Sequence, residues 1–154
     1  MHGRSVPPCT GCTALRRVFA TPQDAELAFY DALERSDLEA MMEVWSEDEE
    51  IICIHPGQPR LVGYDMVRES WQRIFQSGQR LKVRIAAAVQ MTSGMIAIHN
   101  AQEHLRVPDD RTGAMSLATN VFVRGAHGWR MIVHHASPAP APVDVAPSVP
   151  KVLH

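Results

Sequence analysis

Residues 118–138 read ATNVFVRGAHGWRMIVHHASP, two alternating apolar runs on either side of the tight turn 125–128. Val, Ile, Phe and Trp favour strands, and a short Gly-containing turn between two such runs is typical of a hairpin. Two more alternating stretches precede this hairpin and are joined by a Thr-Ser-Gly turn. The alternation therefore predicts four long antiparallel strands, at 81–91, 95–106, 115–124 and 129–136.

Upstream of these strands, the spacing of the apolar residues is helical. Residues 21–24 (TPQD) combine a capping hydroxyl, a proline for the first turn and an acid, which predicts a helix start. Residues 36–39 (SDLE) are a second start signal of the capping-box kind, and a third helical pattern covers 63–77. A short Ile-rich strand is expected at 51–55. This order predicts an α+β fold in which three N-terminal helices pack on one face of a curved, mainly antiparallel sheet.

The composition is that of a globular domain. The chain has 154 residues, 45% of them apolar, and its 15 Lys and Arg against 17 Asp and Glu give a net charge of −2. This balance lacks the basic face of a protein that binds nucleic acid or an anionic membrane. No apolar run reaches the roughly 18 residues of a membrane span, and the N-terminus lacks a signal-peptide pattern. We expect a cytoplasmic protein that binds neither nucleic acid nor membrane.

Both ends of the chain lack a periodic apolar face. Residues 1–20 mix Pro, Gly, Cys and Arg, and residues 138–154 are rich in Pro and Ala. Such segments cannot bury enough apolar surface to fold, so both are predicted to be disordered tails. The expected domain is 21–137.

Four strings carry a family resemblance: ATPQDAELAFYDALERSDLEAMMEVWSED, IICIHPG, LVGYDMVRESWQRIF and the hairpin ATNVFVRGAHGWRMIVHHASP. Over roughly residues 20–140 the sequence resembles the nuclear transport factor 2-like (NTF2-like) superfamily, and within it the small bacterial SnoaL-like and ketosteroid isomerase-like proteins. The resemblance implies an open cone that dimerises through the convex face of its sheet. The superfamily includes isomerases, cyclases, dehydratases and binding modules, so the fold does not fix the function.

His55 is the first candidate catalytic residue. It stands directly before Pro56 at the end of a predicted strand, where ketosteroid isomerases carry an aspartate base before proline. An imidazole accepts a proton near neutral pH, although a strand-end histidine bonded to backbone fits the pattern as well. The tyrosine that polarises the oxyanion in those enzymes corresponds to Phe29, with Tyr30 one residue away.

His134 is the second candidate base. Alternation sends one of His134 and His135 inward and the other outward. His134 is favoured for the pocket because its counterpart in the kinase association domain of this superfamily faces the cavity. His135 is kept as a candidate ligand-binding residue, and a structural, hydrogen-bonded role is open for both.

Three polar residues on the predicted strands are candidate ligand-binding residues. Asn120 lies among apolar residues, where an amide must find partners, so it either orients a ligand or links two strands. Asn100 is a second candidate for orienting a carbonyl group. Glu103 beside an inward histidine would make an acid–base pair, although a surface position is commoner for a glutamate.

Trp45 and Trp71 lie on the apolar faces of their helices. In a cone, the same faces look into the cavity, so the two indoles could wall a pocket for a small apolar or aromatic molecule. The alternative is plain core packing.

No cofactor or metal is expected. Cys9 and Cys12 have the spacing of half a zinc ribbon, but no second pair with ribbon spacing follows, and Cys53 reads as a buried apolar residue.

Two functions remain open from the sequence. One is a cofactor-independent lyase or isomerase of a small carbonyl-bearing or cyclic metabolite, with His55 or His134 as base and Asn120 or Asn100 orienting the carbonyl. The other is a non-catalytic module that binds a small ligand or assembles. A homodimer is expected because both faces of the strand 81–91 are partly apolar.

Overall fold

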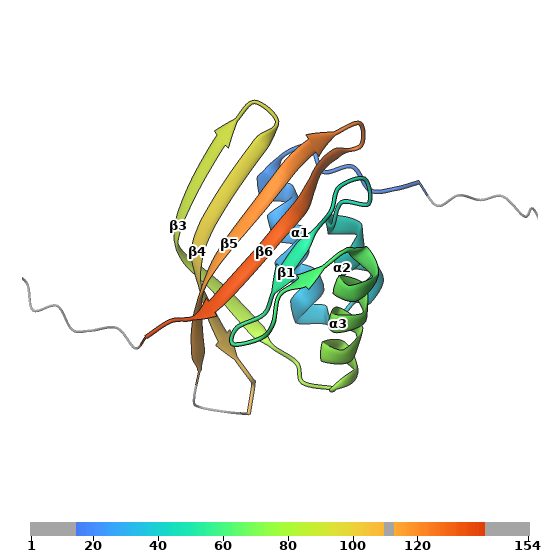
Figure 1. Ribbon diagram of the computed structural model, residues 1–154. Coiled ribbons are helices and arrows are strands. Elements are labelled where there is room, and N and C mark those ends of the chain that lie inside the picture. The colour runs from blue at the N-terminus through green and yellow to red at the C-terminus, as the bar shows by residue number, and fades with distance from the viewer. Residues whose placement is uncertain (1–14, 110–112, 141–154) are drawn as a thin grey trace, which may run out of the picture.

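A six-stranded sheet forms one layer of the molecule, and three helices cover one of its faces (Figure 1). The computed structural model describes residues 15–109 and 113–140. The helices are α1 (Pro22–Arg35), α2 (Leu38–Val44) and α3 (Tyr64–Gln76), and the strands are β1 (Ile52–Ile54), β2 (Leu61–Val62), β3 (Lys82–Ser93), β4 (Ile96–Arg106), β5 (Ala114–Gly125) and β6 (Gly128–Pro138). The predicted α+β class, with three helices on a mainly antiparallel sheet, is confirmed.

The helix starts follow from capping. The side chain of Thr21 accepts a hydrogen bond from the Asp24 amide at 3.0 Å, as its position before Pro22 predicts. The second start differs by one residue from the prediction, because Asp37 and not Ser36 caps α2. Ser36 instead ends α1 in the left-handed region (φ 53°), and this turn changes the direction of the chain.

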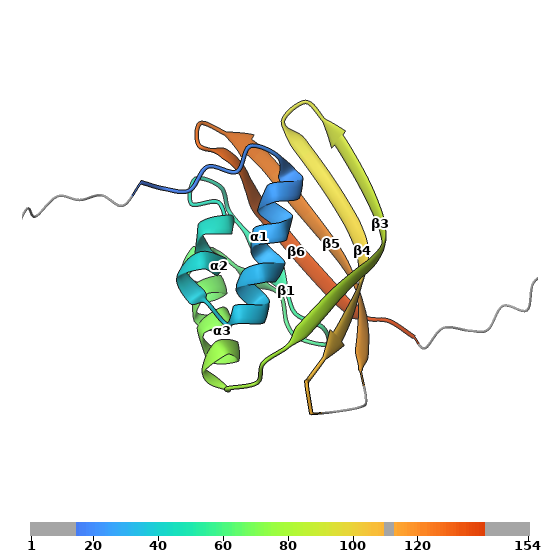
Figure 2. The same cartoon turned by 180° about the vertical axis from the view of Figure 1, so that it is seen from behind.

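The sheet has the order β2-β1-β6-β5-β4-β3. The four long strands form an antiparallel meander, and the short β1 pairs in parallel with β6. The two-residue strand β2 was not predicted, since two residues carry no periodicity. Figure 2 shows α1 in front of the sheet next to β6, and Glu26 on this helix reaches His99 on β4 and Asn120 on β5.

A bulge in β3 reverses which of its side chains face the helices. The register with β4 shifts between Ala86 and Val89, and Ala87 takes a positive φ of 50°. Before the bulge, Val83 and Ile85 pack against the core, whereas Val89 after it is 56% exposed. Simple alternation would put Val83, Ile85 and Val89 on one face of this strand, and the bulge separates them because alternation restarts on its other side.

The N-terminal boundary of the domain also needs correction. Phe19, which the sequence places in a tail, is buried, and its carbonyl oxygen accepts a hydrogen bond from the Trp129 amide at 2.8 Å. At the other end, β6 runs to Pro138. The rest of the predicted tails, 1–14 with Cys9 and Cys12 and 141–154, lies outside the described residues. No helix in the described part of the chain is long and apolar enough to cross a membrane.

Candidate functional site

A buried polar network lies between α1 and the inner face of β4, β5 and β6. Its members share burial below a tenth of their full exposure and are Glu26, Tyr30, His99, Glu103, Ser116, Asn120 and His134. Burial of so many polar groups is costly unless they are hydrogen-bonded to one another. These seven buried polar residues are therefore the main candidates for a functional site.

Asn120 is the centre of this network. Its Nδ2 donates to Glu26 Oε2 and to the Tyr30 hydroxyl oxygen, both at 3.1 Å, and its Oδ1 lies 2.6 Å from His134 Nδ1. Glu26 and Tyr30 are one helical turn apart on α1, so both reach the same amide. Of the two roles open for Asn120, the link between elements is the one these contacts show, since Asn120 on β5 joins α1 to β6.

Glu26 and His99 form a buried pair. His99 Nδ1 lies 3.0 Å from Glu26 Oε2, and because a carboxylate can only accept, this contact places a proton on Nδ1. His99 Nε2 is buried without a hydrogen-bond partner among the described residues. The carboxylate of Glu26 is therefore held by two donors, His99 and Asn120, in a fixed orientation.

Glu103 is the second buried carboxyl group. Its Oε1 accepts a hydrogen bond from Ser116 Oγ at 2.8 Å. Burial raises the pKa of Glu103, while hydrogen bonds from Ser116 and Tyr30 oppose this effect. Burial also raises the pKa of Tyr30, and the nearby Glu103 carboxylate adds to the rise. Tyr30 thus keeps its proton and stands between two carboxyl groups.

A cavity of about 380 Å³ between α1 and β3 opens onto this network. Glu26 and Tyr30 belong to its wall, and Leu27, Val83 and Ile85 add apolar surface. A small molecule in this cavity would meet a carboxylate and a hydroxyl group at one end. Its size lies at the lower end of the range for small-molecule sites.

Burial keeps the two candidate bases neutral near pH 7. It lowers the pKa of His134 to about 3 and that of His55 to about 4. His55 Nε2 lies 2.7 Å from Ser70 Oγ on α3 and 3.7 Å from Cys53 Sγ. His134 belongs to the network and His55 lies toward α3, and both pack against the ring of Trp71, with centroid distances of 6.3 Å and 4.7 Å.

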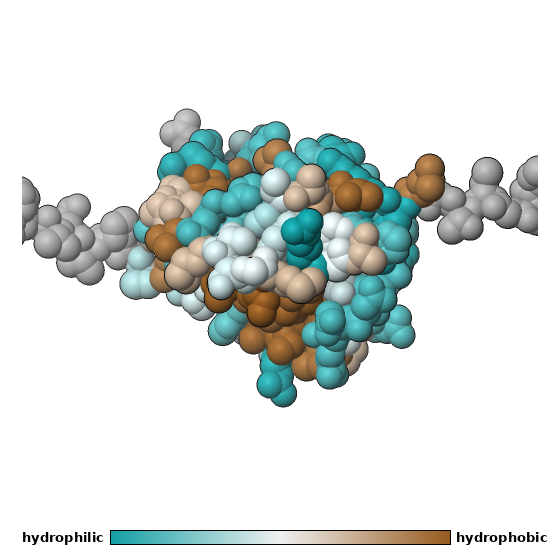
Figure 3. Space-filling view, turned by 90° about the horizontal axis from the view of Figure 1, so that it is seen from above, coloured by the Kyte–Doolittle hydropathy of each residue, from teal (hydrophilic) through white to brown (hydrophobic). Residues whose placement is uncertain are grey.

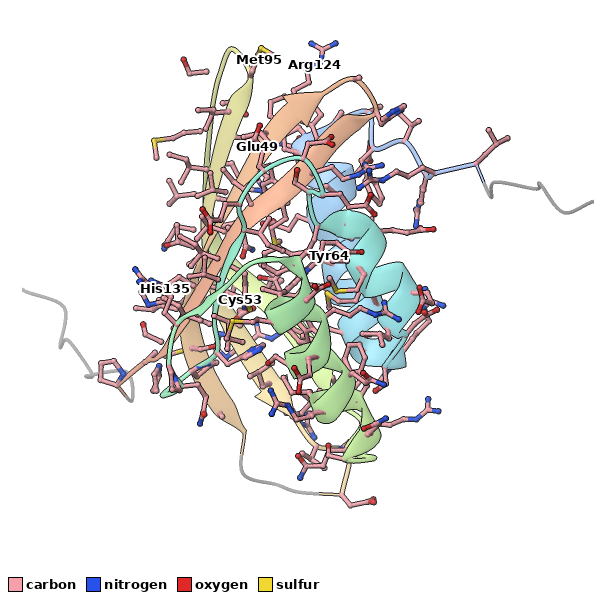
Figure 4. The ribbon with its side chains drawn as sticks, turned by 45° about the vertical axis from the view of Figure 1, so that its right-hand side comes forward. Glu49, Cys53, Tyr64, Met95, Arg124 and His135 are labelled. Carbon is pink, nitrogen blue, oxygen red and sulfur yellow. The ribbon has the colours of Figure 1, made fainter. Side chains whose placement is uncertain are left out.

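His135 and Asn100, two of the candidates from the sequence, lie on the outer face of the sheet. Figure 4 shows His135 on the side of the sheet away from the helices, and its side chain is exposed. Asn100 is exposed on the same outer face, where its Nδ2 donates to Thr119 Oγ1 at 3.0 Å. Strand alternation explains both corrections, because their neighbours His134 and His99 point inward.

The two tryptophans are core residues. Trp45 is fully buried, Trp71 nearly so, and the ring of Phe29 packs edge-on against both, with centroids 6.4 and 5.6 Å away. Neither indole lines the cavity between α1 and β3 or the cavity beside His55. The apolar pocket expected between the indoles is thus filled by Phe29, and the core-packing alternative holds. Cys53 is buried as expected, and its pKa is raised to about 12.

Glu26 and His99 are the functional candidates that the sequence did not single out. The available signal was the position of Glu26, which lies four residues before Tyr30 and next to the apolar stripe of α1. A single glutamate beside an apolar stripe is more often exposed to solvent. Glu26 can therefore be recognised as a site residue only from the folded structure, in which Asn120 on β5 donates a hydrogen bond to it. In residues 15–109 and 113–140, no group of three His, Cys, Asp or Glu is arranged to hold a metal ion.

Solved structures similar to this chain share its fold. A structure from Thiobacillus denitrificans, described as a calcium/calmodulin-dependent protein kinase type II association domain, is 38% identical with a TM-score of 0.74, covering 80% of this chain and 98% of its own. A structure from Streptomyces avermitilis, described as a dehydratase of the NTF2-like family, is 29% identical with a TM-score of 0.69, covering 76% of this chain and 93% of its own.

Sequence comparison gives the family. The F-box protein SKIP8 of Arabidopsis thaliana is 28% identical over 109 residues, which are 71% of this chain and 46% of that protein, so this chain spans about half the length of the curated relative. The family model of the SnoaL-like domain matches residues 23–142. The chain therefore belongs to the SnoaL-like domain family of the NTF2-like superfamily.

Proposed function

We propose that this protein is a cofactor-independent lyase or isomerase that acts on a small carbonyl-bearing metabolite in the cavity between α1 and β3. The observation that carries the proposal is the shared amide: Glu26 and Tyr30 both line the cavity, and Asn120 bonds to both at 3.1 Å. A base and a hydroxyl donor are thus held at one end of one cavity, which is the arrangement that proton transfer next to a carbonyl requires.

In this proposal Glu26 is the general base. The donors His99 and Asn120 fix its Oε2, which leaves its other oxygen as the atom that takes a proton from the substrate. A carboxylate held in this way needs no rearrangement when it reacts, and pre-organisation of this kind is a large part of enzymatic rate enhancement.

Tyr30 is the proposed donor to the substrate carbonyl oxygen. Asn120 Nδ2 already donates to the hydroxyl oxygen of Tyr30, so the hydroxyl proton is directed elsewhere. Glu103 supports this role, since a hydrogen bond to Glu103 is available to Tyr30 in the absence of a ligand. When a substrate is bound, the Tyr30 hydroxyl would donate its hydrogen bond to the substrate carbonyl oxygen instead of to Glu103, as negative charge develops on that oxygen.

His134 is a positioning residue in this scheme, because its Nδ1 holds the Asn120 amide at 2.6 Å and it does not line the cavity. His55 lines a different cavity of about 510 Å³, together with Ser70 and Arg73. In this proposal Glu26, and not a histidine, accepts the proton from the substrate. A variant of His55 therefore serves as a comparison in the test.

The test uses 3-cyclohexen-1-one as a minimal carbonyl probe. Moving a proton from C2 to C4 gives the conjugated 2-cyclohexen-1-one, whose absorbance reports the reaction without any co-reactant. We expect turnover by the wild type, a loss of at least about 100-fold in Glu26→Gln, and little change in Asp31→Asn, which lines the same cavity. Equal rates in Glu26→Gln and the wild type would refute the role of Glu26, and a loss in His55→Ala alone would return the base to His55.

A non-catalytic assembly module is the second candidate. It is favoured by the 38% identity to a structure described as an association domain. Under this reading the buried network only fixes α1 on the sheet, and the protein forms a homodimer through its outer sheet face. We retain the homodimer and the cytoplasmic location as parts of both proposals, and absence of turnover together with a dimer in solution would favour this second candidate.

A further inference from the structure

Ser70 and His55 meet in the wall of the second cavity, of about 510 Å³, which lies between α3 and the turn that joins β1 to β2. Ser70 Oγ lies 2.7 Å from His55 Nε2. Because α3 packs against β2 and lies beside β1 (Figure 1), the two side chains reach each other from different elements. A serine hydroxyl within hydrogen-bond reach of an imidazole is the pairing that activates serine as a nucleophile.

The periodicity of both elements directs these side chains into the cavity. Ser70, Arg73 and Ile74 are three and four residues apart, so they share one face of α3, and all three belong to the cavity wall. On the other side, His55 follows the buried Cys53 by two residues, so alternation points both toward the helices. The contact between His55 and Ser70 agrees with this direction.

The hydroxyl group of Ser70 is bonded to His55 and not to its own helix. Serines in helices often bond back to a carbonyl of the preceding turn, as Ser77 Oγ does to the Ile74 carbonyl at 2.6 Å. Among the described residues, the hydrogen-bond partner of Ser70 Oγ is His55 Nε2. Ser70 is 8% exposed, so little water competes with this contact.

His55 is held where it can accept the hydroxyl proton. Its ring packs edge-on against Trp71, with centroids 4.7 Å apart. Burial keeps the imidazole neutral near pH 7, and in the tautomer with its proton on Nδ1, Nε2 is an acceptor. Cys53 Sγ lies 3.7 Å from the same nitrogen, but burial raises the pKa of this thiol to about 12. Since only a thiolate is strongly nucleophilic, Ser70 is the nucleophile of this cluster.

We propose that Ser70 and His55 form a second catalytic site, which hydrolyses small esters through an acyl group on Ser70. Ser70 Oγ bonds to the ester carbonyl carbon while its proton passes to His55 Nε2. The bond to the leaving oxygen then breaks, and the proton on Nε2 goes to that oxygen. Water attacks the acyl-serine with His55 again as base, which releases the carboxylic acid and restores the Ser70 hydroxyl.

Arg73 is the proposed group that stabilises the developing oxyanion. It stands one helical turn after Ser70 in the same wall, and its guanidinium is only loosely paired, 4.0 Å from Glu69 Oε1. It therefore stays available to a carbonyl oxygen that gains negative charge. The apolar part of the wall consists of Pro59, Leu61 and Ile74. This inference does not depend on catalysis at Glu26, because the two cavities share no lining residue.

The experiment incubates the full chain with p-nitrophenyl acetate, follows the release of p-nitrophenolate, and locates the acetyl group by mass spectrometry of peptides. We expect release faster than in buffer and an acetyl group on Ser70. Ser70→Ala should abolish this adduct, and His55→Gln should lower the acylation rate at least about 100-fold. Arg73→Gln should lower the rate about tenfold, because a partly exposed cation near the oxyanion is lost.

Ser77→Ala is the matched control. Ser77 is exposed at the end of the same helix and outside the cavity wall, so its loss should leave the acylation rate unchanged. Ser70→Ala is expected to fold, since alanine favours helices, and urea unfolding checks this. The position of the acetyl group in the wild type decides the point without any variant. The proposal is overturned if release is no faster than in buffer, if folded Ser70→Ala reacts as fast as the wild type, or if the acetyl group is found on Cys53 or another residue instead of Ser70.

Discussion

Asn120 Oδ1 lies 2.6 Å from His134 Nδ1, and this contact sets the direction of every other hydrogen bond of the amide. An oxygen turned toward His134 leaves Nδ2 to face α1, where it donates to Glu26 and Tyr30. His134 must then carry its proton on Nδ1, since the amide oxygen can only accept. Two adjacent strands and one helix are thereby joined through a single side chain.

Replacement of Asn120 should therefore be strongly destabilising. Asn120→Ala leaves the buried partners Glu26 and His134 without their hydrogen bonds, and each orphaned group costs about 1–3 kcal/mol. We expect a loss of about 3 kcal/mol in the free energy of unfolding, measured with urea. Asn100→Ala, on the exposed face of β4, should change it by less than about 0.5 kcal/mol. Similar losses in both variants would argue against a central role of the Asn120 amide.

The stability of the protein should fall as the pH drops below 6.5. Burial depresses the pKa of His134 to about 3, so between pH 6.5 and pH 3 the unfolded chain takes up a proton that folded His134 does not. The loss attributable to His134 at pH 5 is about 2 kcal/mol. His55, with a pKa of about 4, acts in the same direction.

Urea titrations at pH 7 and pH 5 would measure this loss. A His134→Gln variant, which keeps a hydrogen-bond donor but does not titrate, should lose less stability between the two pH values than the wild type. An identical pH dependence in the variant and the wild type would contradict the assignment of the loss to His134.

The fold was predictable from the sequence because its signals are local. The cap at Thr21, the break near Ser36 and the alternation in β4 to β6 each depend on neighbouring residues, and the structure places elements there. The bulge at Ala87 was missed because alanine carries no turn signal. Its effect is large, since without it alternation would put Val89 and Met91 on the same face as Val83 and Ile85, whereas both are exposed on the outer face.

The candidate site was predictable only in part, because it is assembled from residues distant in sequence. Asn120 and His134 stood out as polar residues in apolar strands, and both are buried in the network. Glu26 gave no such signal, since 94 positions separate it from the amide that holds it. Trp45 and Trp71 were predicted to line a pocket because an apolar helix face has the same sequence pattern whether it borders a cavity or a packed core. In the structure Phe29 packs against both indoles.

The outer sheet face should mediate a homodimer. Apolar side chains exposed on it include Val89, Met91, Ile96 and Leu117, from 40% to 58% exposed. Figure 3, which views the molecule from above, shows apolar residues gathered beside polar ones on the side that it faces. A second copy that covers these residues would bury a substantial apolar area. We expect sedimentation at micromolar concentration to give about twice the 17.1 kDa chain mass, and Met91→Lys to shift it to the monomer. A wild-type mass of one chain would refute the dimer.

The segment before α1 should be essential for stability, contrary to its appearance as a tail. The ring of Phe19 is buried, and Arg17 and Arg130 lie over it at 5.0 and 4.8 Å from its centroid. The backbone of Phe19 also bridges to Gly128, whose positive φ of 86° and lack of a Cβ allow the close approach.

Phe19→Ala should lower the free energy of unfolding by about 3 kcal/mol, since a large buried ring is lost and a cavity remains. Gly128→Ala should also be destabilising, because the added methyl group would collide with the Phe19 carbonyl. Leu15→Ala is the control: Leu15 is 99% exposed, so its truncation should change stability by less than about 0.5 kcal/mol. Urea unfolding of the three variants decides the point. Stability of Phe19→Ala equal to that of Leu15→Ala would restore the boundary at Thr21, with everything before it dispensable.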